Sequence, residues 1–125
     1  MSNALQRPAA WLWPDELDAM QAAPRHHKLI FENDRVRVLD TRIAAGETVP
    51  VHTHRWPAVN HVLRWSDFVR RDAEGKVLVD TRGNPASASQ PFGVWSEPLP
   101  PHTLRNVGAA ELHVVSVEVK DRIPT

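Results

Sequence analysis

The sequence predicts an all-β fold, a sandwich or barrel preceded by one short helix. From Lys28 onward, short runs rich in Val, Ile, Leu and Phe recur at intervals of roughly 8–12 residues and are separated by turn-forming residues. Helix signals are confined to the first 25 residues. With 125 residues and no cysteine, we expect one domain that is stabilised by a hydrophobic core and not by disulfides.

The expected helix lies near the N-terminus. Pro14 can occupy the first helical turn, Pro24 ends the run, and acidic residues that complement the helix dipole lie between them: Asp15, Glu16 and Asp18. We therefore divide the chain into an N-terminal arm with a short helix, residues 1–25, and a β-barrel domain, residues 26–125.

Eight strand-like runs follow this arm. They cover residues 28–32, 35–43, 49–53, 59–64, 67–71, 76–80, 92–95 and 112–119. The turn at residues 72–76 is the clearest hairpin signal, and eight strands of this length suit a jelly roll. Residues 80–91 have no periodicity and are rich in small and polar residues, which predicts a mobile loop.

The composition narrows the choice of partners and chemistry. Lys and Arg together number 15, as do Asp and Glu, so the net charge is zero and neither nucleic acid nor an anionic membrane is an expected partner. A small-molecule ligand is favoured. No N-terminal segment resembles a signal peptide and no stretch approaches the ~20 apolar residues of a membrane span, so we expect a cytoplasmic protein. Because Cys and Tyr are absent, chemistry must come from His, Asp, Glu, Ser, Lys or a metal.

Two histidines stand two residues apart in one expected strand. His52 and His54 should project from the same face of an extended chain, where two neutral imidazoles can chelate a divalent ion. By itself this pattern also arises by chance. His26 and His27 are adjacent, so they should face opposite ways and cannot both bind one ion; a surface role is expected for them.

A wider pattern surrounds these histidines. Gly46 lies six residues before His52, and some fifty residues further on His102 is followed four residues later by Asn106. Together these segments resemble the two motifs of the cupin family, and the match covers roughly residues 31–119. The resemblance implies a cupin double-stranded β-helix, a jelly-roll barrel, in which His52, His54 and His102 are metal ligands. It also implies a homodimer.

The match departs from the family pattern at one ligand. The position at which cupins carry a glutamate holds Ala58 or Val59, so the carboxylate ligand is missing there. The remaining set resembles the three-histidine cupins, of which the thiol dioxygenases are the best-known case. Three neutral ligands favour a divalent transition metal ion, with Fe, Zn, Ni and Cu as the candidates, over Mg or Ca. Open coordination positions would remain for water, oxygen or a chelating substrate.

Three further polar residues are candidates for a role beside the metal, as a fourth ligand or as a residue that orients ligands or moves protons. Asn60 and His61 lie on the strand that should have carried the glutamate, and regular alternation turns Asn60 toward the metal and His61 away from it. His61 is therefore the weaker candidate for a fourth ligand. On the last strand, His113 alternates with Val115, Val117 and Val119, so it either faces the interior and moves protons or is a hydrogen-bonded core histidine.

Tryptophans near the expected ligands suggest a pocket wall. Trp56, Trp65 and Trp95 are candidates for substrate contacts, although core packing is the usual role of Trp. Arg64 is a candidate for pairing with a substrate carboxylate, with a solvated charge at a strand end as the alternative.

The sequence therefore favours a metal-binding cupin, with a dioxygenase-type reaction on a small molecule at a mononuclear three-histidine site as its enzymatic form. The alternative is a non-enzymatic sensor or small-molecule-binding cupin whose metal is structural or absent. Much of this rests on the fold resemblance, because one cupin scaffold supports many activities.

Overall fold

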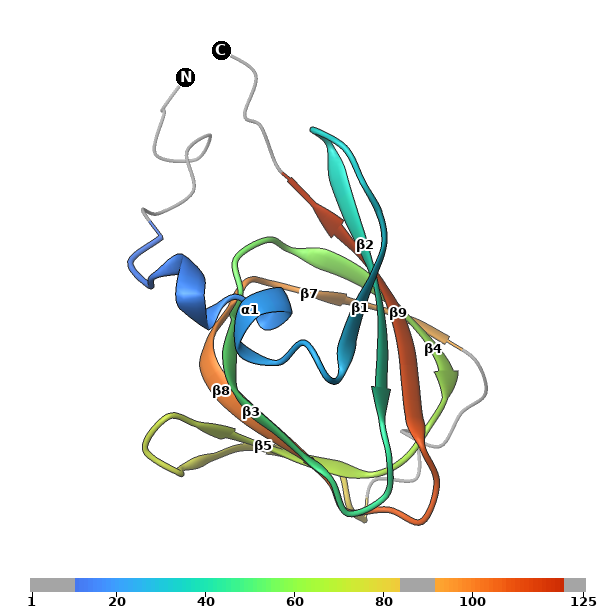
Figure 1. The fold of residues 1–125 in the computed structure, drawn as a ribbon. Coiled ribbons are helices and arrows are strands. Elements are labelled where there is room, and N and C mark those ends of the chain that lie inside the picture. Colours follow the sequence, from blue (N-terminus) through green and yellow to red (C-terminus); the bar gives the residue numbers. More distant parts are fainter. Residues whose placement is uncertain (1–10, 84–91, 121–125) are drawn as a thin grey trace, which may run out of the picture.

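The computed structural model describes residues 11–83 and 92–120 and confirms an all-β jelly-roll barrel with helix only near the N-terminus (Figure 1). Two antiparallel sheets face each other, one in the order β1-β2-β9-β4-β7 and one in the order β3-β8-β5-β6. The strands are β1 (His27–Glu32), β2 (Val36–Ile43), β3 (Thr48–His54), β4 (Ala58–Arg64), β5 (Phe68–Asp72), β6 (Val77–Asp80), β7 (Phe92–Ser96), β8 (Leu99–Asn106) and β9 (Leu112–Val119). None of the helices in the described part of the chain is long and apolar enough to cross a membrane.

The predicted N-terminal helix is divided into two short pieces, a 3-10 turn η1 (Asp15–Leu17) and a helix α1 (Ala19–Ala22). Asp18 separates them because its backbone is extended, with ψ of 144°, and its carboxylate accepts a hydrogen bond from the Met20 amide at 3.0 Å. Ala23, directly after α1, packs into the hydrophobic core. The division of the chain after residue 25 stays a prediction.

Eight observed strands match the predicted runs to within a residue at each end, but β8 was not predicted. Pro100 and Pro101 argue against a strand, since proline donates no hydrogen bond to a ladder. β8 accommodates them where pairing is incomplete: its ladder with β5 begins only at His102, and its ladder with β3 is irregular between His52 and His54. Most of the predicted mobile loop, residues 84–91, lies outside the described residues.

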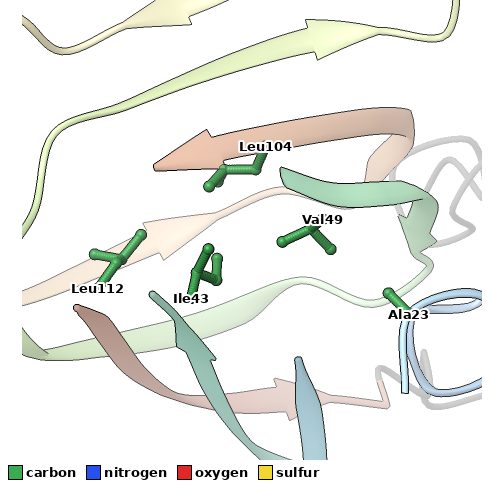
Figure 2. Close-up of a cluster of buried hydrophobic side chains, with 5 residues drawn as sticks. All are labelled: Ala23, Ile43, Val49, Leu104 and Leu112. Atoms are coloured by element: carbon green, nitrogen blue, oxygen red, sulfur yellow. The ribbon is translucent and has the colours of Figure 1, made fainter. Parts of the chain in front are cut away.

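The barrel core lies between the two sheets (Figure 2). Its buried side chains are Ala23, Ile43, Val49, Leu104 and Leu112. Ile43 and Leu112 come from the five-stranded sheet, while Val49 and Leu104 come from the four-stranded sheet. This apolar contact holds the two sheets together, so the polar residues of the interior are not needed for that and can form a binding site.

Asn106, the last residue of β8, is fully buried and uses its whole amide. Oδ1 accepts hydrogen bonds from the Ser66 hydroxyl at 2.7 Å and the Gly108 amide at 2.9 Å. Nδ2 donates to the backbone carbonyls of Ile43 and Ala110, both at 2.8 Å. The asparagine of the second motif is therefore a structural residue, because it ties the ends of β2 and β8 to the loop before β9.

Replacing the donor half of this amide should destabilise the fold. Asn106→Asp keeps the shape but leaves two buried carbonyls without a donor and adds a buried charge, so we expect a loss of about 2–4 kcal/mol in the free energy of unfolding. Asn33→Asp is the matched control, because within the described residues the Asn33 side chain bonds only through Oδ1, which accepts from the Arg35 and Val36 amides. Urea unfolding of both variants measures the difference; equal stability would contradict the structural role of Asn106.

Candidate metal centre

Four histidine rings gather inside the barrel, from three strands of two sheets. His52 and His54 lie on β3, His102 lies opposite His52 on β8, and His27 begins β1. The ring centroids are 4.3 Å apart for His52 and His102, 5.0 Å for His52 and His54, and 5.0 Å for His27 and His52. Ligand nitrogens of His27, His52 and His54 lie within 4.8 Å of one another, and the His102 ring borders this group.

Each ring is oriented by a hydrogen bond at Nδ1. The partners are backbone carbonyls for His27, His52 and His102, at 3.0, 2.7 and 2.7 Å, and a carboxylate for His54, at 3.0 Å. A carbonyl oxygen only accepts, so Nδ1 must carry the proton and Nε2 is left with a free lone pair. This is the arrangement by which proteins prepare imidazoles for a metal.

Burial keeps three of these rings, those of His27, His52 and His102, neutral. It lowers the pKa of His27 to about 4 and that of His102 to about 3, with a further lowering of both from neighbouring charges. Burial also holds the pKa of His52 far below its ordinary range, and the nearby His102 adds to the effect. Neutral imidazole is the form that donates a lone pair, so the cluster is ready to bind a cation at neutral pH.

The cluster opens onto a cavity of about 470 Å³. Apolar side chains from both sheets form much of its wall, and these are Ile43, Val49, Val62, Phe68, Leu99, Leu104, Leu112 and Val114. Asn60 lines it and accepts from the Ser116 hydroxyl at 2.7 Å, while its Nδ2 donates to the Ser96 hydroxyl at 3.0 Å. Such a mixture of apolar wall and a few polar groups is typical of small-molecule sites.

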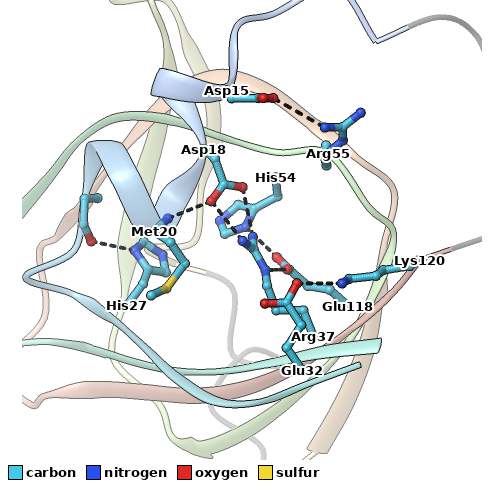
Figure 3. Close-up of polar contacts among 11 residues, drawn as sticks. Asp15, Asp18, Met20, His27, Glu32, Arg37, His54, Arg55, Glu118 and Lys120 are labelled. Atoms are coloured by element: carbon cyan, nitrogen blue, oxygen red, sulfur yellow. Dashed lines mark hydrogen bonds and ion pairs between the residues drawn. The ribbon is translucent and has the colours of Figure 1, made fainter. Parts of the chain in front are cut away.

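A buried ionic network stands behind the cluster (Figure 3). Glu118, only 1 % exposed, accepts from His54 Nδ1 at 3.0 Å and from Arg37 Nε at 2.6 Å. The two remaining guanidinium nitrogens of Arg37 donate to the carboxylate of Asp18, both at 2.9 Å. Burial alone would raise the pKa of Glu118, but the hydrogen bonds from His54 and Arg37 outweigh it and hold that pKa below its usual value.

Solved structures share this architecture. A cupin domain from Bordetella pertussis superposes with a TM-score of 0.58 at 18 % identity, covering 76 % of this chain and 92 % of that chain. A double-stranded β-helix protein from Klebsiella pneumoniae gives 0.52 at 14 % identity, with 78 % of each chain covered. An RmlC-like cupin from Methanocaldococcus jannaschii gives 0.52 at 12 % identity, covering 74 % of this chain and 77 % of that chain.

The chain has the cupin fold. No protein-family model matches the sequence, and no curated protein matches it either. At these identities the structural likeness establishes the fold alone, so the cupin scaffold is shown while the activity must be argued from the site.

The missing cupin glutamate has a spatial replacement on the neighbouring strand. Ala58, one of the two residues at which the motif would carry its glutamate, lies directly opposite Glu118 in the β4–β9 ladder. From there the carboxylate hydrogen-bonds to the far side of the His54 ring, at Nδ1. The negative charge is thus retained beside the cluster, where it orients a histidine.

The inward-facing position considered for His113 was wrong, although the hydrogen bond of the alternative role is observed, on the half-buried outer face of β9. Val114, Ser116 and Glu118 line the cavity, so His113 faces away and its Nε2 lies 2.6 Å from Asp40 on β2. The alternating valines that indicated the inward face belong to the outer face of the sheet. No periodicity signal in the sequence distinguishes the two faces, because apolar residues alternate on both.

The surface role predicted for the adjacent histidines was also wrong. His26 is 7 % exposed and His27 is 4 % exposed. His26 faces away from the cluster, with Nε2 at 3.4 Å from the Glu47 carboxylate. Alternation correctly predicted that His26 and His27 face opposite ways, but it left open that one of them could join the cluster, as His27 does. No spacing rule links His27 to the two cupin motifs.

The other candidates divide between the cavity and the outside. Asn60 faces inward as alternation predicts, and His61 is exposed on the opposite face, which gives it no place in the cluster. Trp65 and Trp95 line the cavity, whereas Trp56 does not and instead lies against cationic groups of Arg37, Arg55 and Lys120. Arg64 is exposed outside the cavity, after a register shift in the β4–β9 ladder that follows Val62.

Metal-free protein should lose stability in mild acid. Because the folded pKa of His27 is about 4 and an unfolded histidine titrates near 6.5, the unfolded chain takes up the proton first as the pH falls. His27 alone should then cost on the order of 2 kcal/mol between about pH 7 and pH 4.5, and stability should be constant above that window. Urea unfolding in a chelator across this range measures the slope. His27→Gln should reduce the slope without abolishing it, because His52 and His102 stay buried and neutral. His61→Gln, an exposed control, should leave the slope unchanged, and a flat wild-type profile would contradict the burial argument.

Proposed function

We propose that this cupin binds a divalent transition metal ion through its histidine cluster and holds a small molecule in the cavity beside it. The observation that carries the proposal is the common orientation of the four rings. Each has its Nδ1 proton engaged and its Nε2 free in one buried cluster at the cavity wall. A cluster needed only for packing would gain nothing from free lone pairs, and the ligand atoms of His27, His52 and His54 lie within 4.8 Å of one another.

The donor set fits a borderline ion. His27, His52 and His54 form the compact group, and His102 adjoins it from the partner strand of β3. Neutral imidazoles suit Fe, Zn, Ni or Cu and offer no hard oxygen ligand for Mg or Ca. When bound, such an ion would supply a Lewis-acid or redox centre.

The residues around the cluster would perform the rest of the work. Glu118 orients the ring of His54 through Nδ1, as carboxylates do behind metal-bound histidines. Asn60 and Ser116 offer an amide and a hydroxyl to a ligand from the cavity wall. The apolar wall excludes water. A dioxygenase-type reaction on a small molecule is the enzymatic form of this proposal, and oxygen uptake by metal-loaded protein is its test.

Single histidine substitutions should separate ligands from bystanders. His54→Ala and His52→Ala should abolish stoichiometric metal in protein purified without a histidine tag, since each removes a lone pair from the centre of the group. His27→Ala tests the residue that the motifs did not indicate and should weaken binding at least tenfold. Elemental analysis and metal titration provide the readout, with circular dichroism to verify folding. His113→Ala, on the outer face, is the control; full metal content in His54→Ala would contradict the proposal.

The carboxylate behind His54 should tune the site without being a ligand. Glu118→Gln keeps the shape but removes the charge that orients the ring, so metal affinity should fall about 10–100-fold while the stoichiometry stays the same. Asp40→Asn makes the same change at a half-buried histidine–carboxylate contact outside the cavity, with His113, and should leave the affinity unchanged. Competition with a chromophoric chelator measures both. Complete loss of metal in Glu118→Gln would indicate that the carboxylate is itself a ligand.

A further inference from the structure

Arg70 projects into the same cavity from the four-stranded sheet. It lies on β5 between Leu104 of β8 and Val79 of β6, and it lines the cavity together with Phe68, two residues earlier. His102 lies diagonally across the β5–β8 ladder, opposite Asp72, and lines the cavity as well. Side chains in this diagonal relation are about 7–8 Å apart at their bases, within the reach of an arginine. The guanidinium therefore belongs to the part of the cavity beside the histidine cluster.

This arginine has no partner within residues 11–83 and 92–120. Its Nε is buried without a hydrogen bond, and the side chain forms no ion pair there; its only specific contact is with the Phe68 ring, whose centroid is 5.5 Å from the guanidinium carbon. Burial lowers the pKa of Arg70, but an arginine stays protonated in proteins. Arg70 is half-buried as a whole, but its Nε is shielded from water without a hydrogen bond. Such a charged group without a counter-charge is costly, and proteins retain one mainly where something else supplies the charge.

The charges on the cavity wall also indicate that Arg70 needs a counter-charge from a ligand. Apart from histidines, two ionisable residues line the described cavity, Arg70 and Glu118. Glu118 already receives hydrogen bonds from Arg37 and His54, so its charge is matched behind the wall. The charge of Arg70 is left facing the cavity, which accordingly favours an anion.

We propose that Arg70 binds the carboxylate of a small organic acid whose apolar part packs against the wall around Phe68 and Leu104. A guanidinium and a carboxylate match in charge and in planar geometry, and they pair through two parallel hydrogen bonds. A phosphate monoester carries a second charge, for which the described wall offers no further arginine or lysine. The inference rests on the proposed function only in taking this cavity as the small-molecule site, and it does not require the metal.

Isothermal titration of chelator-treated full-length protein tests the anchor. The probes are hexanoate and phenylacetate, with hexanamide and phenylacetamide as neutral counterparts. Wild type should bind at least one of the acids at least tenfold more tightly than its amide, and Arg70→Met should remove that preference. Arg71→Met is the matched control, since Arg71 is the next residue of β5 and lines a separate surface pocket, so it should behave as wild type.

Two neutral variants at position 70 keep the proposal falsifiable. Arg70→Met removes an unmatched buried charge, so it should fold, and Arg70→Gln provides a second neutral variant with the same expected loss. The proposal is overturned if neither acid binds wild type, if both Arg70 variants bind the acids as wild type does, or if phenyl phosphate binds more tightly than phenylacetate. Metal content, measured in parallel, separates this proposal from the proposed metal site. If the protein binds the acids but no metal, the carboxylate site at Arg70 stands and the metal site fails. If it binds metal but neither acid, only the carboxylate site fails.

Discussion

The buried ion pair between Arg37 and Glu118 is the contact on which the rest of the site depends. Glu118 is almost inaccessible to solvent, and its two oxygens serve Arg37 and His54. Asp18 completes the arrangement by accepting from the other two guanidinium nitrogens. Removing one partner of such a pair costs about 3–5 kcal/mol because an uncompensated charge stays buried. The pair therefore holds β2, β9, the N-terminal segment and a cluster histidine in one fixed relation.

That relation makes the N-terminal segment part of the site. Asp18 anchors the segment to Arg37, and five residues later the carbonyl of Ala23 accepts from His27 Nδ1 at 3.0 Å. The side chain of Ala23 is buried in the barrel core. One short stretch thus contacts the ion pair, the core and the histidine cluster, and a displacement of this stretch would disturb all three together. The cluster is complete only when the segment is folded against the barrel.

Residues next to one another in sequence were easier to predict than residues that meet only in the fold. Apolar periodicity predicted eight strands and the shared face of His52 and His54, because both depend on local alternation. β8 was missed because its prolines occupy interrupted ladder positions, which a single sequence does not reveal. Glu118 was missed because valines on the outer face of β9 imitate an inward apolar stripe. His27 and Arg70 carry no local signal at all: their roles come from burial and from the partners they have or lack.

Moving the carboxylate from β4 to β9 changes the electrostatics of the cavity. A glutamate at Ala58 would place a negative charge among the ligands, as the cupin motif does. Glu118 instead acts from behind His54, where Arg37 also matches its charge. The histidine lone pairs then remain neutral donors, a bound cation would keep its full charge, and Arg70 adds a further positive charge on the adjoining wall. All three effects have the same sign, so the position of this one carboxylate favours the anion that we propose for the cavity.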